Sequence, residues 1–315
     1  MSRLLLEVTK LQPQDIVVLH DLDITVVTPD TVTAADISEI EISYGWSTEI
    51  GKKILADPTS KLRWVQTMSA GVDYMPLAEL ADRQVMLTNA SGLKSVPIAQ
   101  SVISYILHFA RGLNVYQTQT HWQEFTDQYT ISELPTVIFG TGNIGRQIAH
   151  YLKALGGRVY GVNTSGHPVD GFDDVVAIDN LGALPDDIAV VVDVLPGTDT
   201  TVNFFNAERF ATLGDLYLFI NVGRGTTVNQ ADLITSLQAG TIRQAALDVT
   251  LPEPLPDDSP LWQQPNLLLT QHTTWAENSS AGRAGNLFPL LVKNLPSYLA
   301  NEPLSVNVVD LTRGY

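Results

Sequence analysis

The sequence predicts an α/β protein built on parallel sheets, and three observations carry this prediction. Short apolar runs alternate with helix-length segments along the chain. A G-x-G-x-x-G motif lies between such a run and a helical pattern, in residues 137–149. Polar stretches follow several of the runs where a strand would end. We therefore expect two Rossmann-like domains: a doubly wound parallel-sheet domain, residues 99–275, inserted into a smaller flavodoxin-like domain, residues 1–98 plus 276–315.

The first hundred residues predict a small parallel sheet. The runs that we expect to form strands are residues 16–19, 41–44, 62–67 and 85–88. Ser69-Ala70-Gly71-Val72-Asp73 follows the third run, at the carboxyl end where open α/β sheets place ligands. A helical pattern then occupies residues 95–115, with Val102, Ile106, Phe109 and Leu113 on one face. This helix would lead out of the first domain.

The glycine motif predicts a strand, a tight turn and a helix. Gly140 allows the turn, Gly142 lets the backbone approach a pyrophosphate, and Gly145 lets the helix pack on the strand. The helical face is formed by Ile144, Ile148, Tyr151 and Leu155. The N–H groups at the start of this helix would face phosphates. The motif with its flanking elements therefore indicates a dinucleotide site.

An irregular polar stretch, residues 117–133, precedes this motif, and further apolar runs follow it. The expected strands are residues 158–162, 175–178, 189–194, 217–221, 245–249 and 267–270. A last helical segment, residues 280–299, has the length to return to the first domain. Three polar stretches follow the last three strands: residues 221–225, 248–256 and 270–273. In a parallel sheet they would meet at one edge with the pyrophosphate loop.

The composition excludes several classes of function. The chain has 18 basic and 34 acidic residues, a formal net charge of -16, so nucleic acid and membrane partners are not expected. It has no cysteine, which excludes disulfides and thiolate catalysis. The histidines lack paired metal-ligand spacing, and we expect no metal. The start shows no signal-peptide pattern and no run spans a membrane, so the expected location is the cytoplasm.

The order of the motifs resembles the D-isomer-specific 2-hydroxyacid dehydrogenase family over nearly the whole chain. The matching pieces are residues 69–73, Gly140 to Arg146, Leu195-Pro196-Gly197-Thr198, Asn221 to Gly225, Ala246-Leu247-Asp248-Val249, Glu253-Pro254-Leu255-Pro256 and Thr270-Gln271-His272. The resemblance implies reduction of a 2-oxo acid to a D-2-hydroxy acid with a nicotinamide cofactor, in a homodimer.

The resemblance also implies roles for single residues. Arg224 would hold the substrate carboxylate and polarise the carbonyl, because its guanidinium is a charged fork of donors. His272 would donate the proton, and Glu253 would pair with it and fix its orientation. The N–H groups of Ala70 and Gly71 would bind the other end of the carboxylate.

Two aromatic residues are weighed as parts of the substrate side-chain pocket. Trp275 would form a wall of this pocket, with interdomain packing as an equal alternative. Tyr44 lies beyond a first-domain strand and resembles a position that sets the size of the substrate side chain in related enzymes. The chain departs from the family at two positions. Gln271 stands where a proline is usual, and Gln100 stands where the family usually has an acidic residue.

The remaining implied contacts are with the cofactor. They comprise Gly140, Gly142, Asn143, Ile144, Gly145, Arg146, Asn163, Thr164, Ser165, Leu195, Pro196, Thr201, Val222 and Asp248. Asp248 would lie near the nicotinamide carboxamide, or else cap nearby amides at its strand end.

The choice of cofactor depends on the turn after the second Rossmann strand. An acid there binds the ribose 2′-hydroxyl and repels a 2′-phosphate. Asn163 occupies this position, followed by the hydroxyls of Thr164 and Ser165 and the imidazole of His167. The sequence therefore predicts that NADPH/NADP is preferred, with NADH/NAD as the alternative.

Three functions are left open by these residues. The first is an NADPH-dependent D-2-hydroxyacid dehydrogenase that reduces a small-molecule 2-oxo acid. The second is a glyoxylate or hydroxypyruvate reductase of the same superfamily. The third is a non-enzymatic, nicotinamide-sensing protein like a corepressor, which the acidic charge and the lack of long disordered extensions argue against.

Overall fold

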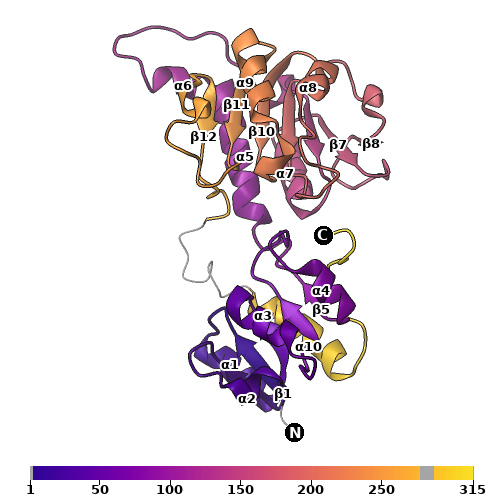
Figure 1. Cartoon of the computed structure of the whole chain (residues 1–315). Helices are drawn as coiled ribbons and strands as arrows, with labels where there is room; N and C mark the ends of the chain where they lie inside the picture. Colours follow the sequence, from indigo (N-terminus) through magenta and orange to yellow (C-terminus); the bar gives the residue numbers. More distant parts are fainter. Residues whose placement is uncertain (1–2, 277–286, 315) are drawn as a thin grey trace. The chain divides into compact units, whose positions relative to one another are not determined.

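A computed structural model describes residues 3–276 and 287–314 and divides the chain into two compact units. The first unit comprises residues 1–93 and 277–315, and the second comprises residues 94–276. Figure 1 shows the elements of each unit in the colours of the sequence. The division lies five residues before the boundary predicted at 98/99 and one residue after that predicted at 275/276.

The first unit contains a parallel sheet of five strands in the order β2-β1-β3-β4-β5. The strands are β1 (Arg3–Glu7), β2 (Ile24–Val27), β3 (Ile40–Tyr44), β4 (Trp64–Gln66) and β5 (Met86–Thr88). This is the strand order of flavodoxin-like folds. The prediction of a smaller flavodoxin-like domain is therefore confirmed.

Helices cover both faces of this sheet. They are α1 (Pro13–Asp21), α2 (Ala34–Ile37), α3 (Thr48–Ala56), α4 (Leu77–Asp82) and α10 (Phe288–Leu299). Leu19 and Leu291 of α1 and α10 pack with Leu5 on one face, while Ile54 and Leu80 of α3 and α4 pack with Leu6 on the other. Leu5 and Leu6 face opposite sides because side chains alternate along a strand.

The prediction of a strand at residues 16–19 is wrong. These residues lie inside α1, and the neighbouring strands of the sheet are β1 and β2, which the sequence did not predict. The run of Ile16, Val17 and Val18 favours a strand by propensity. Pro13 in the first turn and the backbone N–H of Gln12, which donates to the Asp15 carboxylate over 3.0 Å, start a helix instead. The packing of Leu19 in the core of the first unit then stabilises this helix.

The second unit contains a parallel sheet of seven strands in the order β12-β11-β10-β9-β6-β7-β8. The strands are β6 (Thr136–Phe139), β7 (Val159–Asn163), β8 (Asp174–Ala177), β9 (Val190–Asp193), β10 (Leu216–Asn221), β11 (Ile242–Leu247) and β12 (Leu267–Leu269). The strand order reverses between β6 and β9, where a doubly wound sheet places its ligand. The predicted doubly wound fold is confirmed, and all its predicted strands are present within a few residues.

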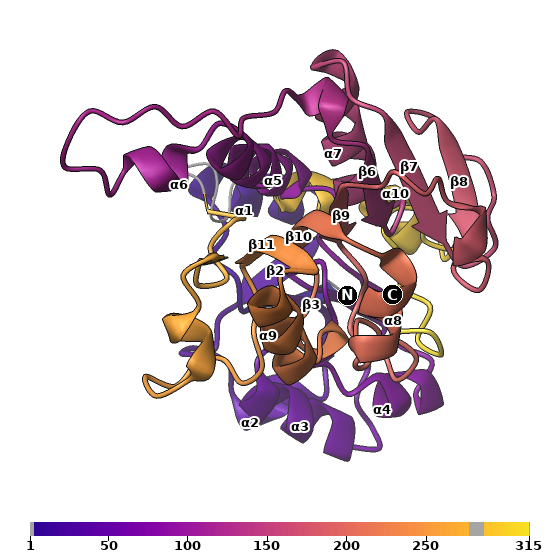
Figure 2. The same cartoon turned by 90° about the horizontal axis from the view of Figure 1, so that it is seen from above.

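Figure 2 shows this sheet between two helical layers. α5 (Ser95–Ala110) and α7 (Asn143–Ala154) cover one face, where Ile106 and Ile148 pack with Ile138. α8 (Ala207–Leu213) and α9 (Gln230–Ala239) cover the other, where Phe210 and Leu233 pack with Phe139. Short 3-10 turns, η1 (Ile131–Glu133), η2 (Leu181–Ala183), η3 (Gly225–Thr227) and η4 (Pro260–Gln263), connect these elements.

Two helix predictions need correction at their ends. The helix predicted over residues 95–115 stops at Ala110, because Gly112 adopts φ 65°, and a separate α6 (Leu113–Tyr116) follows. Leu113 is consequently 51% exposed and lies off the apolar face. Leu155 is likewise the C-cap residue of α7 and half exposed. Of the helix predicted at 280–299, residues 280–286 lie outside the described residues.

No helix in the described ranges has the length and apolar character that crossing a membrane requires.

Candidate active site

The carboxyl ends of five neighbouring strands of the second unit meet at one edge of its sheet. β6, β9, β10, β11 and β12 run parallel and pair in register, with Phe139 opposite Asp193, Asp193 opposite Asn221, and Leu247 opposite Leu269. The segments that leave these strands carry the glycine motif, Arg224, Glu253 and His272. The fold thus brings these predicted residues to one edge, as expected for a ligand site.

The glycine motif forms the turn from β6 into α7. Gly140 has φ 106°, a conformation that favours glycine, and a Cβ on Gly145 would lie 2.0 Å from the Gly140 carbonyl oxygen. A Cβ on Gly142 would meet nothing within 4 Å. Gly142 is also the N-cap of α7 and has no side chain to accept from the first N–H groups of the helix. Arg146 Nε donates to the Thr141 carbonyl over 3.3 Å.

These features fit a bound pyrophosphate. Apart from Gly142 and its two chain neighbours, no described atom lies within 4 Å of where a Cβ on Gly142 would be, and Gly142 caps the N-terminus of a twelve-residue helix, which is the positive end of the helix dipole. Ile144 packs into the core behind the turn and fixes the first turn of α7. The residues present therefore suit a dinucleotide.

The turn after β7 is organised by the side chain of Asn163. Its Nδ2 donates to Thr141 Oγ1 over 3.2 Å and to the His167 carbonyl over 3.0 Å. Its Oδ1 accepts from the N–H groups of Ser165 (3.2 Å) and Gly166 (2.7 Å). Ser165 Oγ lies 3.0 Å from His167 Nδ1. The amide thus ties this turn to the glycine motif, while Thr164, Ser165 and His167 are exposed.

Four predicted cofactor residues lie around the ends of β9 and β10. The Leu195 N–H donates to Asp193 Oδ1 over 2.9 Å, and the Val222 N–H donates to the Asp193 carbonyl over 3.0 Å. Thr201 Oγ1 donates to the Pro196 carbonyl over 2.6 Å and holds the loop in a compact turn. The structure brings these residues together, and their contact with the cofactor stays a prediction.

Arg224 lies in a loop that packs closely on its neighbours. A Cβ on Gly225 would lie 2.0 Å from the Thr250 carbonyl oxygen, and one on Gly223 would lie 2.6 Å from the Leu195 carbonyl oxygen. Arg224 is partly buried, and its Nη1 donates to the Gly223 carbonyl over 2.9 Å. The two glycines therefore allow the Arg224 loop to sit between the segments that carry Leu195 and Glu253.

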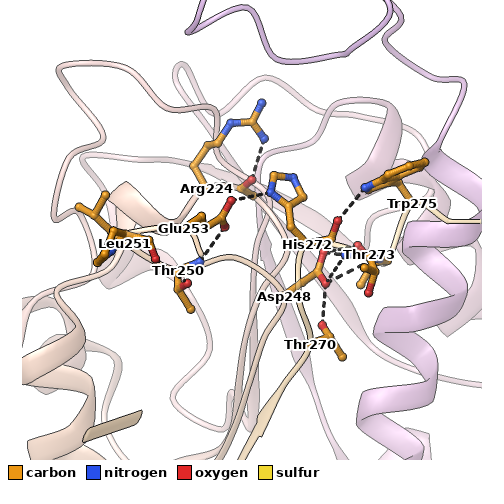
Figure 3. A network of polar contacts seen from close by, with 12 residues as sticks. Arg224, Asp248, Thr250, Leu251, Glu253, Thr270, His272, Thr273 and Trp275 are labelled. Carbon is orange, nitrogen blue, oxygen red and sulfur yellow. Dashed lines mark hydrogen bonds and ion pairs between the residues drawn. The ribbon is translucent and has the colours of Figure 1, made fainter. Parts of the chain in front are cut away.

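His272 and Glu253 form a direct pair. His272 Nδ1 lies 2.8 Å from Glu253 Oε2, while Glu253 Oε1 accepts from the Thr250 N–H over 3.0 Å. Figure 3 shows the Arg224 side chain beside this pair. The two side chains are 45% and 36% exposed, so the pair is accessible to a small molecule. Nδ1 of the ring faces the carboxylate, and Nε2 is the nitrogen that remains for a ligand.

Asp248 holds the backbone segment that carries His272. Its buried carboxylate accepts from Thr270 Oγ1 (2.6 Å), the Thr273 N–H (3.0 Å) and Thr274 Oγ1 (2.6 Å), as Figure 3 shows in part. Its carbonyl accepts from the His272 N–H over 2.7 Å. His272 has φ 54°, which is costly for a residue other than glycine, so these bonds fix an unfavourable backbone conformation. The cofactor contact predicted for Asp248 remains a prediction.

Trp275 closes the other side of this segment. Its Nε1 donates to the His272 carbonyl over 2.7 Å, and Lys94 Nζ lies 5.7 Å from the ring centroid. Trp275 as a whole residue is 38% exposed. A role in the substrate pocket stays a prediction, but the hydrogen bond gives Trp275 a place next to His272 that the sequence did not indicate.

Ala70, Gly71 and Tyr44 belong to the first unit. The Ala70 carbonyl accepts from Asn89 Nδ2 and the Gly71 carbonyl from Ser69 Oγ, both over 2.8 Å, which fixes these peptides. Tyr44 is the last residue of β3 rather than beyond it, and its side chain is 0% exposed in the core. Burial raises the pKa of its hydroxyl. The substrate contacts of all three stay predictions.

The structure also contains polar residues at this edge that the sequence reasoning missed. Asp193 is fully buried at the end of an apolar strand, and Thr227 Oγ1 lies 2.5 Å from its Oδ2. Burial raises the pKa of the Asp193 carboxyl to about 7. The sequence does contain a signal for Asp193, because an acidic residue ends the otherwise apolar run Val190-Val191-Val192-Asp193 and a buried charge is costly. Within the described ranges, no group of three or more potential metal ligands occurs.

The fold and this edge define a class of protein. A doubly wound sheet with a glycine-rich strand-turn-helix and an accessible His-Glu pair at the same edge is the arrangement of a nicotinamide-dependent oxidoreductase. Residues 103–274 match the family model of the D-isomer specific 2-hydroxyacid dehydrogenase, NAD binding domain. The chain therefore belongs to the D-isomer specific 2-hydroxyacid dehydrogenase family and is an NAD(P)-dependent oxidoreductase.

Several similar proteins support the membership of this chain in the family. A glyoxylate/hydroxypyruvate reductase A from Salmonella choleraesuis (strain SC-B67) is 29% identical over 265 residues, which cover 81% of this chain and 82% of the relative. A phosphoglycerate dehydrogenase structure from Lactobacillus plantarum is 36% identical with a TM-score of 0.58, and the match covers 98% of this chain and 100% of that one. A family structure from Xanthobacter autotrophicus Py2, in complex with NADPH and MES, is 29% identical with a TM-score of 0.83 and coverage of 100% and 99%.

Proposed function

We propose that this protein reduces small 2-oxo acids, such as glyoxylate and hydroxypyruvate, to 2-hydroxy acids of the D series with NADPH. The observation that carries the proposal is the His272-Glu253 pair, 2.8 Å between Nδ1 and Oε2, at the sheet edge where the glycine motif begins α7. The name of the Salmonella relative supports the small substrates.

The bound nicotinamide would supply a hydride to the 2-carbon of the acid. Arg224 would bind the substrate carboxylate and polarise the carbonyl, because a guanidinium offers charged donors in a fork. His272 would donate a proton from Nε2 to the oxygen of the reduced carbonyl. Glu253 would hold the ring through Nδ1 and stabilise its positive charge before the transfer. Asp248 would act by holding the His272 backbone.

The preference for NADPH is a proposal that follows from the turn after β7. Asn163 has no charge, and its amide is used inside the turn, so it presents no carboxylate to repel a 2′-phosphate. The exposed Thr164, Ser165 and His167 offer hydroxyls and an imidazole that can bind phosphate oxygens. The Xanthobacter relative, solved with NADPH, supports this choice.

The experiment that tests the proposed function is a substrate panel with both cofactors. Purified protein is mixed with NADPH or NADH and with glyoxylate, hydroxypyruvate, pyruvate or a bulkier 2-oxo acid, and nicotinamide absorbance is followed. We expect the highest kcat/KM with a small 2-oxo acid and NADPH. A higher kcat/KM with NADH would overturn the cofactor assignment. If neither NADPH nor NADH were oxidised with any 2-oxo acid, the proposed reaction would be overturned.

Homodimerisation and a cytoplasmic location also remain proposals, supported by the family resemblance and by the cysteine-free composition. Light scattering on the purified protein measures the first of these directly, with twice the chain mass of 34.3 kDa as the expected result.

A further inference from the structure

A buried carboxyl group lies beneath the loop that carries Arg224, and the proposed mechanism makes no use of it. Asp193 ends β9, and its side chain is 0% exposed. Oδ1 accepts from the Leu195 N–H over 2.9 Å, and Oδ2 lies 2.5 Å from Thr227 Oγ1. The same Thr227 oxygen lies 2.7 Å from the carbonyl oxygen of Arg224. Asp193 is therefore linked to Arg224 through one hydroxyl group.

The hydrogens available in this cluster indicate the protonation state of Asp193. Thr227 Oγ1 has one hydrogen but two short contacts with acceptor oxygens, the Asp193 carboxyl and the Arg224 carbonyl. Asn221 Nδ2 donates to the Arg224 carbonyl over 2.9 Å and to Thr227 Oγ1 over 3.3 Å, and so supplies no hydrogen between Thr227 and Asp193. Both short contacts contain a hydrogen only if Asp193 has its own proton.

The surroundings also favour a neutral carboxyl group. Charged side chains on α7 and on the loops after β9, β10 and β11 include Arg146 and Lys153, Asp199, Arg224 and Asp248, in that order of elements. The contacts that the described residues make with the Asp193 carboxyl group come from the Leu195 N–H and the Thr227 hydroxyl, and neither of these groups is a cation. A buried carboxylate without a cation is costly. Burial accordingly raises the pKa of Asp193 to about 7.

We propose that Asp193 is a positioning residue in the neutral acid form, whose proton completes a hydrogen-bond chain from its carboxyl group through the Thr227 hydroxyl to the Arg224 carbonyl. In this form Asp193 donates to Thr227 Oγ1, and Thr227 donates to Arg224. When Asp193 ionises, the Thr227 hydrogen turns to the carboxylate, and two oxygens 2.7 Å apart lose the hydrogen between them. The Arg224 backbone then relaxes, and binding of a substrate carboxylate weakens above neutral pH.

Infrared spectroscopy of the intact protein tests the protonation state without any assay of activity. At pH 6 the wild type should show the carbonyl stretch of a protonated carboxylic acid, and this band should disappear as the pH rises past neutrality. Asp193→Asn should lack the band, while Asp199→Asn, an exposed acid on the same loop, should keep it. A wild-type spectrum without the band at pH 6 would overturn the proposal.

Kinetics test the link to Arg224, and this arm rests on the proposed function. Between pH 6 and pH 9 the wild-type KM for glyoxylate with NADPH should rise by about fivefold more than that of Asp193→Asn, because asparagine keeps a donor toward Thr227 at every pH. Thr227→Val, which removes the hydroxyl, should have a raised KM at both pH values. An equal rise in the wild type and Asp193→Asn would contradict the positioning role. Should glyoxylate not be reduced at all, the proposed function fails, and the infrared result still decides the state of Asp193.

Discussion

Glu253 and His272 lie 2.8 Å apart between Oε2 and Nδ1, although 19 residues separate them in the sequence. One follows β11 and the other follows β12, two strands that pair in parallel register. The pairing of these strands explains why the two loops meet. Glu253 is itself held by the Thr250 N–H, so the carboxylate reaches the histidine in a fixed direction. The proposed proton donor thus depends on the geometry of the sheet edge.

Glu253→Gln tests the electrostatic part of this pair. Glutamine has the size of glutamate but no charge to stabilise the protonated ring, so kcat for 2-oxo acid reduction should fall about 100-fold. The dissociation constant of NADPH, measured by fluorescence titration, should change little. Glu208→Gln, an exposed acid of α8, is the matched control. A kcat within twofold of the wild type would show that Glu253 has no part in proton donation.

Two glycine variants separate folding from cofactor binding. Gly142→Ala should leave the melting temperature unchanged, because its Cβ meets nothing within 4 Å and φ is -77°. It should nevertheless weaken NADPH binding by about tenfold or more, since the methyl group would occupy the space beside the pyrophosphate. Gly145→Ala should instead destabilise the fold by about 1–3 kcal/mol, because its Cβ lies 2.0 Å from the Gly140 carbonyl oxygen.

Thermal unfolding and a binding titration check both variants. Wild-type affinity for NADPH in Gly142→Ala would mean that the dinucleotide does not approach the backbone at this turn.

Asn163→Asp tests the cofactor preference. The new carboxylate would repel a 2′-phosphate and favour a ribose hydroxyl, so kcat/KM with NADPH should fall far more than with NADH. Asn163→Ala separates this charge effect from the loss of the hydrogen bonds to Thr141 and His167, and it should affect both cofactors alike. Equal losses with both cofactors in Asn163→Asp would indicate that the turn does not contact the 2′-position.

The stability of the protein should depend on pH through Asp193. Its pKa is about 7 in the folded state and has the ordinary value of 3.8 when exposed, so between these values the folded state binds a proton that the unfolded state lacks. The free energy of unfolding of the wild type, relative to Asp193→Asn, should therefore decrease as the pH rises from 4 to 7 and change little above. The decrease should be up to about 4 kcal/mol, because each pH unit of this window corresponds to about 1.4 kcal/mol.

Urea denaturation of both proteins at several pH values measures this difference. A constant difference across the range would contradict a neutral Asp193 in the folded state.

The sequence could predict the parts of the fold in which local pattern and packing agree. The run at residues 137–149 combines strand-forming residues, glycines and a helical period, and β6, the turn and α7 occur there. The run Ile16-Val17-Val18 misleads because its residue types favour strands, while Pro13 and the packing of Leu19 require a helix. β1 was missed because Leu4, Leu5 and Leu6 are not branched at Cβ, as the Val, Ile and Thr residues typical of strands are.

The candidate site shows the same limit. His272, Glu253 and Arg224 could be predicted because each follows a predicted strand. The order of the motifs, which resembles that of the family, implied their roles. The contacts that hold them could not be found. Thr227 and Asp193 are 34 residues apart, and only the register between β9 and β10 brings them together. The left-handed backbone of His272 likewise depends on the carboxylate of Asp248, which no local pattern reveals.

The most direct test of the proposed reaction is the rate of NADPH oxidation with glyoxylate by the wild type and by His272→Gln, with His121→Gln, an exposed histidine, as control. We expect the wild type and the control to oxidise NADPH as glyoxylate is reduced. His272→Gln should lose about 100- to 10,000-fold in kcat, the contribution typical of a general acid, and should bind NADPH as the wild type does. Undiminished turnover in His272→Gln would contradict the assignment of His272 as the proton donor.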